Sequence, residues 1–167
     1  MPSIPQALYD KYNEICDDFI NLNFGQTCRL LYPPKRTACE NCVYDTITQR
    51  SSGVYKNGGP VSFSFGICPW CDGVGFKETE NTDDIKMRVY WERRSWIKIN
   101  IPINIPDGMI QTIGFMTDVP KIKQAQVVII NPNLSGIQTW SYTLSADPVP
   151  HGLGPSKRYF IAYWKRV

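Results

Sequence analysis

The sequence predicts a mainly β protein: a small antiparallel β-barrel or sandwich with an N-terminal amphipathic helix and an inserted module built on two cysteine pairs. Three observations support this. Apolar residues recur at helical spacing near the N-terminus, two C-x-x-C pairs follow, and apolar and polar residues alternate through much of the second half. With 167 residues, 43% of them hydrophobic, the chain is long enough to bury a core.

The first element is a predicted helix that begins near a capping box and ends before Gly25. Ser3 and Gln6 have the capping-box spacing, and Pro5 suits an early helical position. We expect a buried stripe made of Leu8, Tyr12, Ile15, Cys16 and Phe19, and a solvated face made of Asp10, Lys11, Glu14, Asp17 and Asp18. Cys16 is then a small apolar residue.

The middle of the chain is predicted to hold short strands and one exposed loop. Residues 27–32 are extended, and Pro33-Pro34 prevents a helix there. The polar, Gly-rich segment 46–60 is predicted to be the loop, and the alternation over 61–65 predicts a strand.

The remaining strands follow from alternation between turn residues. Asp107-Gly108 is a hairpin signal, and the Pro/Gly-rich segment 147–155 is predicted to be a surface loop. The predicted strands cover 85–91, 97–105, 109–116, 124–130, 137–144 and 158–164. Five or more short antiparallel strands are typical of a barrel or sandwich.

Charge and hydropathy give no sign of a nucleic-acid or membrane partner. The net charge of +3 is too small to indicate a nucleic-acid or membrane-surface protein. The longest aliphatic run, 127–130, is too short to span a bilayer, and no signal peptide is evident. We therefore expect synthesis in the cytoplasm, no membrane partner and reduced cysteines.

Four of the six cysteines form the metal-binding pattern. Two C-x-x-C turns each present two thiolates, and a tetrahedral zinc ion needs four. The 25 residues between the pairs fit a hairpin excursion, so we predict a structural zinc; spacing does not distinguish zinc from iron. The alternative is two disulfides or free thiols, and Cys28 is the reserve ligand. The predicted ligands are Cys39, Cys42, Cys68 and Cys71.

Catalytic patterns are absent from the sequence. The single histidine, His151, lies in the predicted loop 147–155 with no evident nucleophile or orienting carboxylate. There is no phosphate-binding glycine loop and no His-Glu-x-x-His. A four-cysteine shell also leaves no open metal position. We expect a non-enzyme with no small-molecule substrate.

Basic and aromatic clusters raise the alternative of nucleic-acid binding. Phosphate contacts with base stacking would use the pairs 93–94, 157–158 and 165–166 together with Trp91 and Trp96. We expect instead that the basic residues are solvated strand edges and that the two tryptophans lie in the core.

The second cysteine pair resembles a known zinc repeat. Residues 68–76, CPWCDGVGF, are similar to one C-x-x-C-x-G-x-G unit of the cysteine-rich domain of Hsp40 (DnaJ-type) chaperones. The resemblance implies zinc ligation by Cys68 and Cys71, with glycines that let the chain pass close to the knuckle. Cys42 lacks the following glycines, so chaperone activity is not carried over.

A looser resemblance covers more of the chain. The helix, the cysteine pairs around 51–60, the segment 114–122 (GFMTDVPKI) and the end 158–166 (RYFIAYWKR) resemble tailed-bacteriophage virion proteins of the neck, or head-to-tail joining group. The resemblance implies a homo-oligomeric ring between portal and tail, with portal, adaptor or tail proteins as partners. The alternative is a zinc-ribbon nucleic-acid-binding module.

These patterns divide the chain into three segments of one compact unit. We expect 1–35 to form the helix and first strand, 36–80 the two-knuckle zinc module with its exposed loop, and 81–167 the β-barrel.

Overall fold

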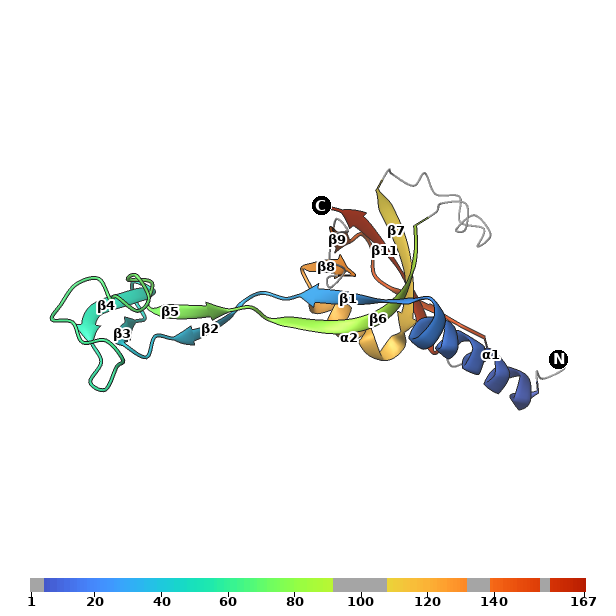
Figure 1. Ribbon diagram of the computed structural model, residues 1–167, viewed down its shortest axis with the longest axis horizontal. Helices are drawn as coiled ribbons and strands as arrows, with labels where there is room; N and C mark the ends of the chain where they lie inside the picture. Colours follow the sequence, from blue (N-terminus) through green and yellow to red (C-terminus); the bar gives the residue numbers. More distant parts are fainter. Residues whose placement is uncertain (1–4, 92–107, 132–138, 154–156) are drawn as a thin grey trace. The chain divides into compact units, whose positions relative to one another are not determined.

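The computed structural model describes residues 5–91, 108–131, 139–153 and 157–167 (Figure 1). They divide into two compact units. The barrel unit comprises residues 1–32 and 82–167, and the cysteine unit comprises residues 33–81. The cysteine unit is therefore an insertion between two strands of the barrel unit.

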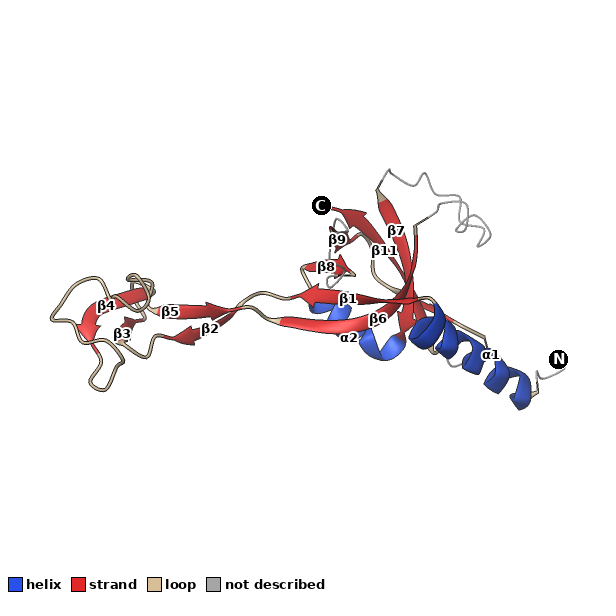
Figure 2. Ribbon diagram, viewed as in Figure 1, coloured by secondary structure: helices blue, strands red, loops and turns tan. Residues whose placement is uncertain are grey.

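The barrel unit is a closed antiparallel β-barrel, which confirms the predicted fold class (Figure 2). Six strands pair in the order β11-β7-β6-β1-β8-β9, and β9 pairs back onto β11 to close the barrel. The strands are β1 (Gly25–Leu31), β6 (Thr82–Tyr90), β7 (Met109–Phe115), β8 (Val127–Ile130), β9 (Trp140–Leu144) and β11 (Tyr159–Arg166). Closure leaves no long unpaired edge.

The barrel core is built from buried side chains of its strands, and burial alternates along β6 but is continuous at the start of β11. In β6, the side chains of Ile85, Met87 and Val89 are buried while those between them face outward. The largest core side chain is Trp164, whose Nε1 donates a hydrogen bond to Thr112 Oγ1 at 2.8 Å. The indole N–H is therefore satisfied inside the barrel.

The N-terminal helix is confirmed, but its apolar stripe is less buried than predicted. Helix α1 (Gln6–Asp18) continues into a π-turn (Phe19–Asn23), and the first fully buried side chain is Ile20. Leu8 and Ile15 are 57% and 44% exposed, which corrects the expected buried stripe. Cys16 is part-buried.

A glycine allows the π-turn to pack against the start of β1. A Cβ at Gly25 would lie 1.6 Å from the carbonyl oxygen of Ile20, so no larger residue fits there. In the sequence, Gly25 marks the end of the helical pattern. In the structure, it lets the start of β1 lie close to the backbone of Ile20.

Two short elements of the barrel unit were not predicted. Strand β10 (Val149–His151) pairs with the first residues of β11, inside the expected loop 147–155. Helix α2 (Val119–Gln124) follows a 3-10 turn (Met116–Asp118), with Pro120 in its first turn and Ile122 buried. Their few residues carry too little periodicity to distinguish them from loops.

The cysteine unit consists of two strand pairs joined by turns. Strand β2 (Lys35–Ala38) pairs with β5 (Phe76–Thr79), and β3 (Cys42–Asp45) pairs with β4 (Arg50–Tyr55). Strand β4 lies inside the segment expected to be a loop, 46–60. The strand predicted over 61–65 is absent: these residues form bends and irregular backbone, and Phe63 packs against the cysteines.

Several predictions fall outside the described residues. These are the strand over 97–105, the turn residue Asp107, the capping residue Ser3, and the side chains of Arg93, Arg94 and Trp96. Within the described ranges, no helix has the length and apolar character needed to cross a bilayer.

Candidate metal centre

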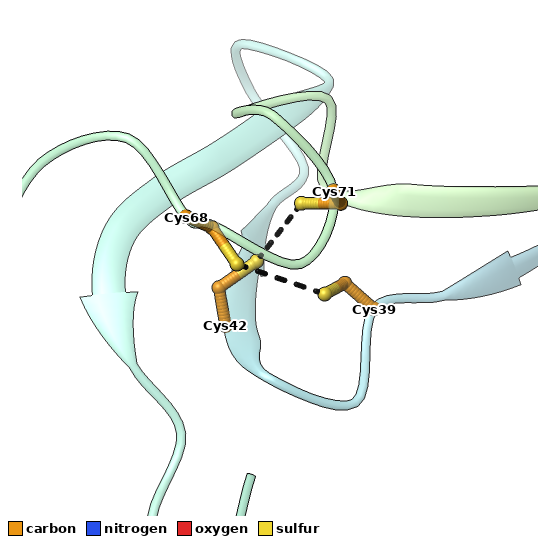
Figure 3. Close-up of side chains that lie close together, drawn as sticks. All are labelled: Cys39, Cys42, Cys68 and Cys71. Carbon is orange, nitrogen blue, oxygen red and sulfur yellow. Dashed lines mark hydrogen bonds between the residues drawn. The ribbon is translucent and has the colours of Figure 1, made fainter. Parts of the chain in front are cut away.

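The structure brings the four predicted cysteine ligands together in the cysteine unit (Figure 3). Cys39 follows β2, Cys42 begins β3, and Cys68 and Cys71 lie in the turns before β5. The two knuckles are joined by a hydrogen bond from Cys39 N to the carbonyl oxygen of Gly75, at 3.0 Å. Two strand pairs thus hold residues 29 positions apart in one cluster.

The sulfur separations match a tetrahedral metal site. The Sγ atoms of Cys39 and Cys68 lie 3.9 Å apart, those of Cys42 and Cys71 lie 3.7 Å apart, and all four are within 4.8 Å of one another. With zinc–sulfur bonds of about 2.3 Å, the edge of a tetrahedron is about 3.8 Å. The same separations are far longer than a disulfide bond of about 2.05 Å. All six cysteines are free.

The cluster is also the core of its unit. Among the described residues between 33 and 81, the buried side chains classed as hydrophobic are Cys39, Cys42 and Cys68, with Phe63 and Cys71 packed against them. A unit of about 50 residues with so little apolar core needs a staple such as a metal ion. The residues present therefore fit a metal.

Hydrogen bonds to three of the sulfurs favour thiolates. The backbone N–H of Asn41 donates to Cys39 Sγ at 3.4 Å, and its side-chain Nδ2 donates to Cys68 Sγ at 3.4 Å. The backbone N–H of Gly75 donates to Cys71 Sγ at 3.2 Å. Such donors orient metal-bound thiolates and stabilise their charge.

The thiols differ in their pKa. Burial raises the pKa of Cys42 to about 12 and also raises the pKa of Cys71. Burial acts in the same direction on Cys68, but hydrogen bonds from the Asn41 side chain and from the backbone of Trp70 and Cys71 lower its pKa to about 6. Cys68 is therefore the thiol most readily present as thiolate.

Asn41 is a supporting residue that the sequence analysis missed. It is fully buried, its Oδ1 accepts a hydrogen bond from Val61 N at 2.8 Å, and its carbonyl oxygen accepts one from Lys56 N at 3.0 Å. A Cβ at Gly59 would lie 2.7 Å from Asn41 Oδ1, so the chain passes close by. The feature of the sequence that could have indicated this role is the polar residue between Cys39 and Cys42.

Two glycines after Cys71 allow a backbone conformation and a close approach that a larger residue would not. Gly73 and Gly75 have φ of +81° and +85°, in the left-handed region that favours glycine. A Cβ at Gly75 would lie 2.6 Å from Ser51 N on β4. The glycines therefore let the second knuckle pack against β4.

Comparison with known protein families, with curated proteins and with solved structures finds no match.

The other two cysteines lie in the barrel unit. Cys28 is fully buried on β1, its Sγ lies 3.5 Å from the carbonyl oxygen of Gln26, and burial raises its pKa to about 12. It belongs to the barrel core, which removes it as the reserve ligand. Cys16 lies outside the cluster.

The remaining candidates are placed differently from expectation. His151 is half-buried on β10 and lines a cavity of about 70 Å³ together with Tyr12 and Cys16; burial, and then the charge of Lys157, lowers its pKa. It is therefore not a solvated loop histidine. Trp91 is 45% exposed, rather than in the core, with its ring against Tyr142.

Proposed function

We propose that the four-cysteine cluster holds a structural zinc and that the chain is a neck protein of a tailed-bacteriophage virion, forming a ring between portal and tail. The proposal for the metal rests on the cluster being the core of its unit. The proposal for the role rests on the resemblance in sequence and on the apolar surface described below.

The chemistry of the ligands favours zinc. Four thiolates are soft ligands, and zinc with four cysteines is closed to water and substrate, which suits a structural role. When bound, the ion would neutralise thiolate charge and fix the two knuckles. Cys39, Cys42, Cys68 and Cys71 would hold it.

Elemental analysis of the purified chain tests the metal. We expect about one zinc per chain by tetrahedral stoichiometry. Iron in place of zinc, with the visible absorption of an iron–thiolate centre, or clearly substoichiometric metal, would contradict the proposal.

The observation that carries the proposed role is the apolar surface of the cysteine unit. Ile47, Phe65 and Ile67 are 91%, 77% and 78% exposed, although the unit has few apolar side chains inside. In the proposed virion, these side chains would be covered where the cysteine unit contacts another protein. A zinc-stapled unit that presents them rigidly lowers the entropy lost on docking.

In the proposed ring, barrels pack side by side through heterologous contacts that close into a cyclic oligomer. The turns that flank β4 within 46–60, and the residues of 147–153 around β10, would contact neighbouring rings, because exposed segments on a rigid scaffold are where recognition concentrates. The isolated chain would then be monomeric until its neighbours are present.

An inventory of purified particles tests the role. We expect mass spectrometry of virions to find the chain, and a map of the particle to place it at the neck. A chain that is absent from particles and occurs free in the cytosol bound to nucleic acid would contradict the proposal and favour the zinc-ribbon module.

A surface variant adds a test that does not depend on folding. Phe65→Ser together with Ile67→Ser changes side chains that are exposed in the chain. We expect normal zinc content but reduced incorporation into particles. Ser64→Ala, directly before Phe65 and also exposed, is the matched control and should be incorporated normally.

A further inference from the structure

The cysteine unit carries a groove lined in part by arginines, and none of the four cysteines is among its lining residues. Its volume is about 380 Å³. The groove lies where the start of β4 meets the turn after Cys71 and the β2–β5 pair, and it is lined by Arg36, Gln49, Arg50, Asp72, Val74 and Phe76, with the backbone of Gly73.

Arg36 is held with part of its guanidinium unused. Its Nε donates to Glu78 Oε1 at 2.8 Å across the β2–β5 pair, and its Cζ lies 4.5 Å from the centre of the Phe76 ring. Within the described ranges its two terminal nitrogens donate no hydrogen bond. The guanidinium is thus fixed in place while two groups of donors remain available.

Arg50 has no acidic partner within the part of the chain that the structure describes. The residue opposite it on β3 is Asp45, but that carboxylate accepts hydrogen bonds from Ile47 N at 2.9 Å and Thr48 Oγ1 at 2.7 Å. These hydrogen bonds hold the Asp45 carboxylate in its turn, and no ion pair joins it to Arg50 among the described residues. The Arg50 guanidinium therefore lines the groove without an ion-pair partner.

One acidic residue also lines the groove. Asp72 has φ of +50° and is exposed directly after the ligand Cys71. The lining residues carry two guanidinium groups and one carboxylate, and Glu78 pairs with Arg36 from outside the lining. The groove is therefore suited to an anion that takes several donors at once, and guanidinium groups match phosphate oxygens in geometry and charge.

We propose that this groove binds phosphate groups, with Arg36 and Arg50 as the contacts and Asp72 as a charge that weakens binding. The two sources of that chemistry are a nucleic-acid backbone and free inorganic phosphates. The proposal needs only the fold of the cysteine unit, so it stands or falls separately from the virion role.

The test is a titration of the full, metal-loaded chain with a short fluorescent DNA duplex, and in a second arm with inorganic pyrophosphate. Two phosphate contacts predict that duplex affinity falls about tenfold between about 50 and about 200 mM salt. Arg50→Gln should weaken binding about fivefold to tenfold and reduce the salt slope by about one. Arg36→Gln should act in the same direction.

Two further variants make the test specific to the groove. Asp72→Asn keeps a residue that tolerates the left-handed backbone and removes the negative charge, so it should strengthen binding. Lys56→Gln removes an exposed charge of the same unit that does not line the groove, and should leave affinity unchanged.

The results distinguish a nucleic-acid backbone from free phosphate as the ligand, and a specific site from a non-specific effect of charge. Arg50-dependent binding of the duplex supports the site with nucleic acid as its source, and Arg50-dependent binding of pyrophosphate alone supports it with a free phosphate as its source. Binding of neither probe, or equal losses for Arg50→Gln and Lys56→Gln, would overturn the proposal, because the charge would then act without a site.

Discussion

The Tyr159 hydroxyl oxygen lies 2.8 Å from Asp17 Oδ1 and 3.0 Å from the carbonyl oxygen of Asn13. Tyr159 begins β11 and is 1% exposed, while both of its partners lie on α1. The adjacent Arg158 donates to Asp17 Oδ2 at 2.6 Å. One end of the last barrel strand therefore anchors a helix that has few buried side chains of its own.

Tyr159→Phe should loosen this anchor. Removing the hydroxyl leaves the partners on α1 without the buried donor, and a lost hydrogen bond to a charged group costs about 1.5 to 3 kcal/mol of unfolding free energy. Denaturant unfolding followed by circular dichroism measures this. Tyr9→Phe is the control, since its hydroxyl makes no hydrogen bond among the described residues and should cost little. Equal effects of both changes would contradict the role of the Asp17 contact.

Because of Tyr159, we expect the folded chain to lose stability at alkaline pH. Burial, followed by the hydrogen bond to Asp17 and its negative charge, raises the pKa of Tyr159 far above its usual value. The folded chain thus keeps a proton that the unfolded chain releases near pH 10. This contribution to stability is present below about pH 10 and falls as the pH rises above it.

Comparison of the wild type with Tyr159→Phe isolates that effect. The unfolding free energy of the wild type should decrease more steeply above about pH 10 than that of the variant. Parallel curves for the two proteins would contradict the prediction.

The predictable part of the fold consists of apolar strands that border the barrel core. The strands β6, β7 and β11 were predicted within a few residues: burial alternates along β6, whereas β7 and β11 bury consecutive residues. Strand β4 was not predicted, because in a unit without an apolar core its burial pattern carries no period of two. The prediction over 61–65 was wrong for a related reason: apolar and polar residues alternate there, but the unit has no apolar core against which a strand could pack, and Phe63 packs against the cysteines instead.

Gly25→Ala should be strongly destabilising. The added Cβ would lie 1.6 Å from the backbone oxygen of Ile20, and backbone is not free to rotate away as a side chain is. We expect a loss of about 3 kcal/mol or more in the unfolding free energy of the barrel unit. Gly108→Ala is the comparison: its Cβ would approach nothing closer than 3.4 Å, so only its left-handed backbone costs about 1 kcal/mol. Similar losses for both would exclude the steric explanation.

Cys68→Ser should unfold the cysteine unit and leave the barrel folded. The cluster is the core of one unit, whereas the barrel has its own buried core around Trp164. Loss of a structural zinc site removes several kcal/mol from the folding of its unit. We expect new protease cleavage within 33–81, with the barrel resonances in an NMR spectrum unchanged.

Cys16→Ser is the matched control for this change. Its thiol lies outside the cluster, so metal content should be retained. Metal content in Cys68→Ser equal to that of the control would contradict ligation by Cys68.

The four cysteines of the candidate site were predicted from spacing alone, whereas their support was not. Two C-x-x-C pairs need only to meet in space, and a tetrahedron of sulfurs then follows. The side chain of Asn41 reaches Cys68 because of the backbone conformation of the first knuckle and because the chain at Gly59 passes close to Asn41. Spacing in the sequence does not predict either feature.

Asn41→Asp tests whether this supporting residue matters for the metal. The substitution keeps the shape of the side chain and an oxygen that accepts the hydrogen bond from Val61 N, but it replaces the donor to Cys68 Sγ with a negatively charged oxygen. Repulsion between that oxygen and the thiolate should reduce zinc affinity about 10- to 100-fold. Competition with a chromophoric chelator measures the affinity. Glu40→Gln, at the exposed neighbouring position of the same knuckle, should leave it unchanged. Equal affinities for the two variants would mean that the hydrogen bond to Cys68 contributes nothing to metal binding, and that the cysteines alone determine it.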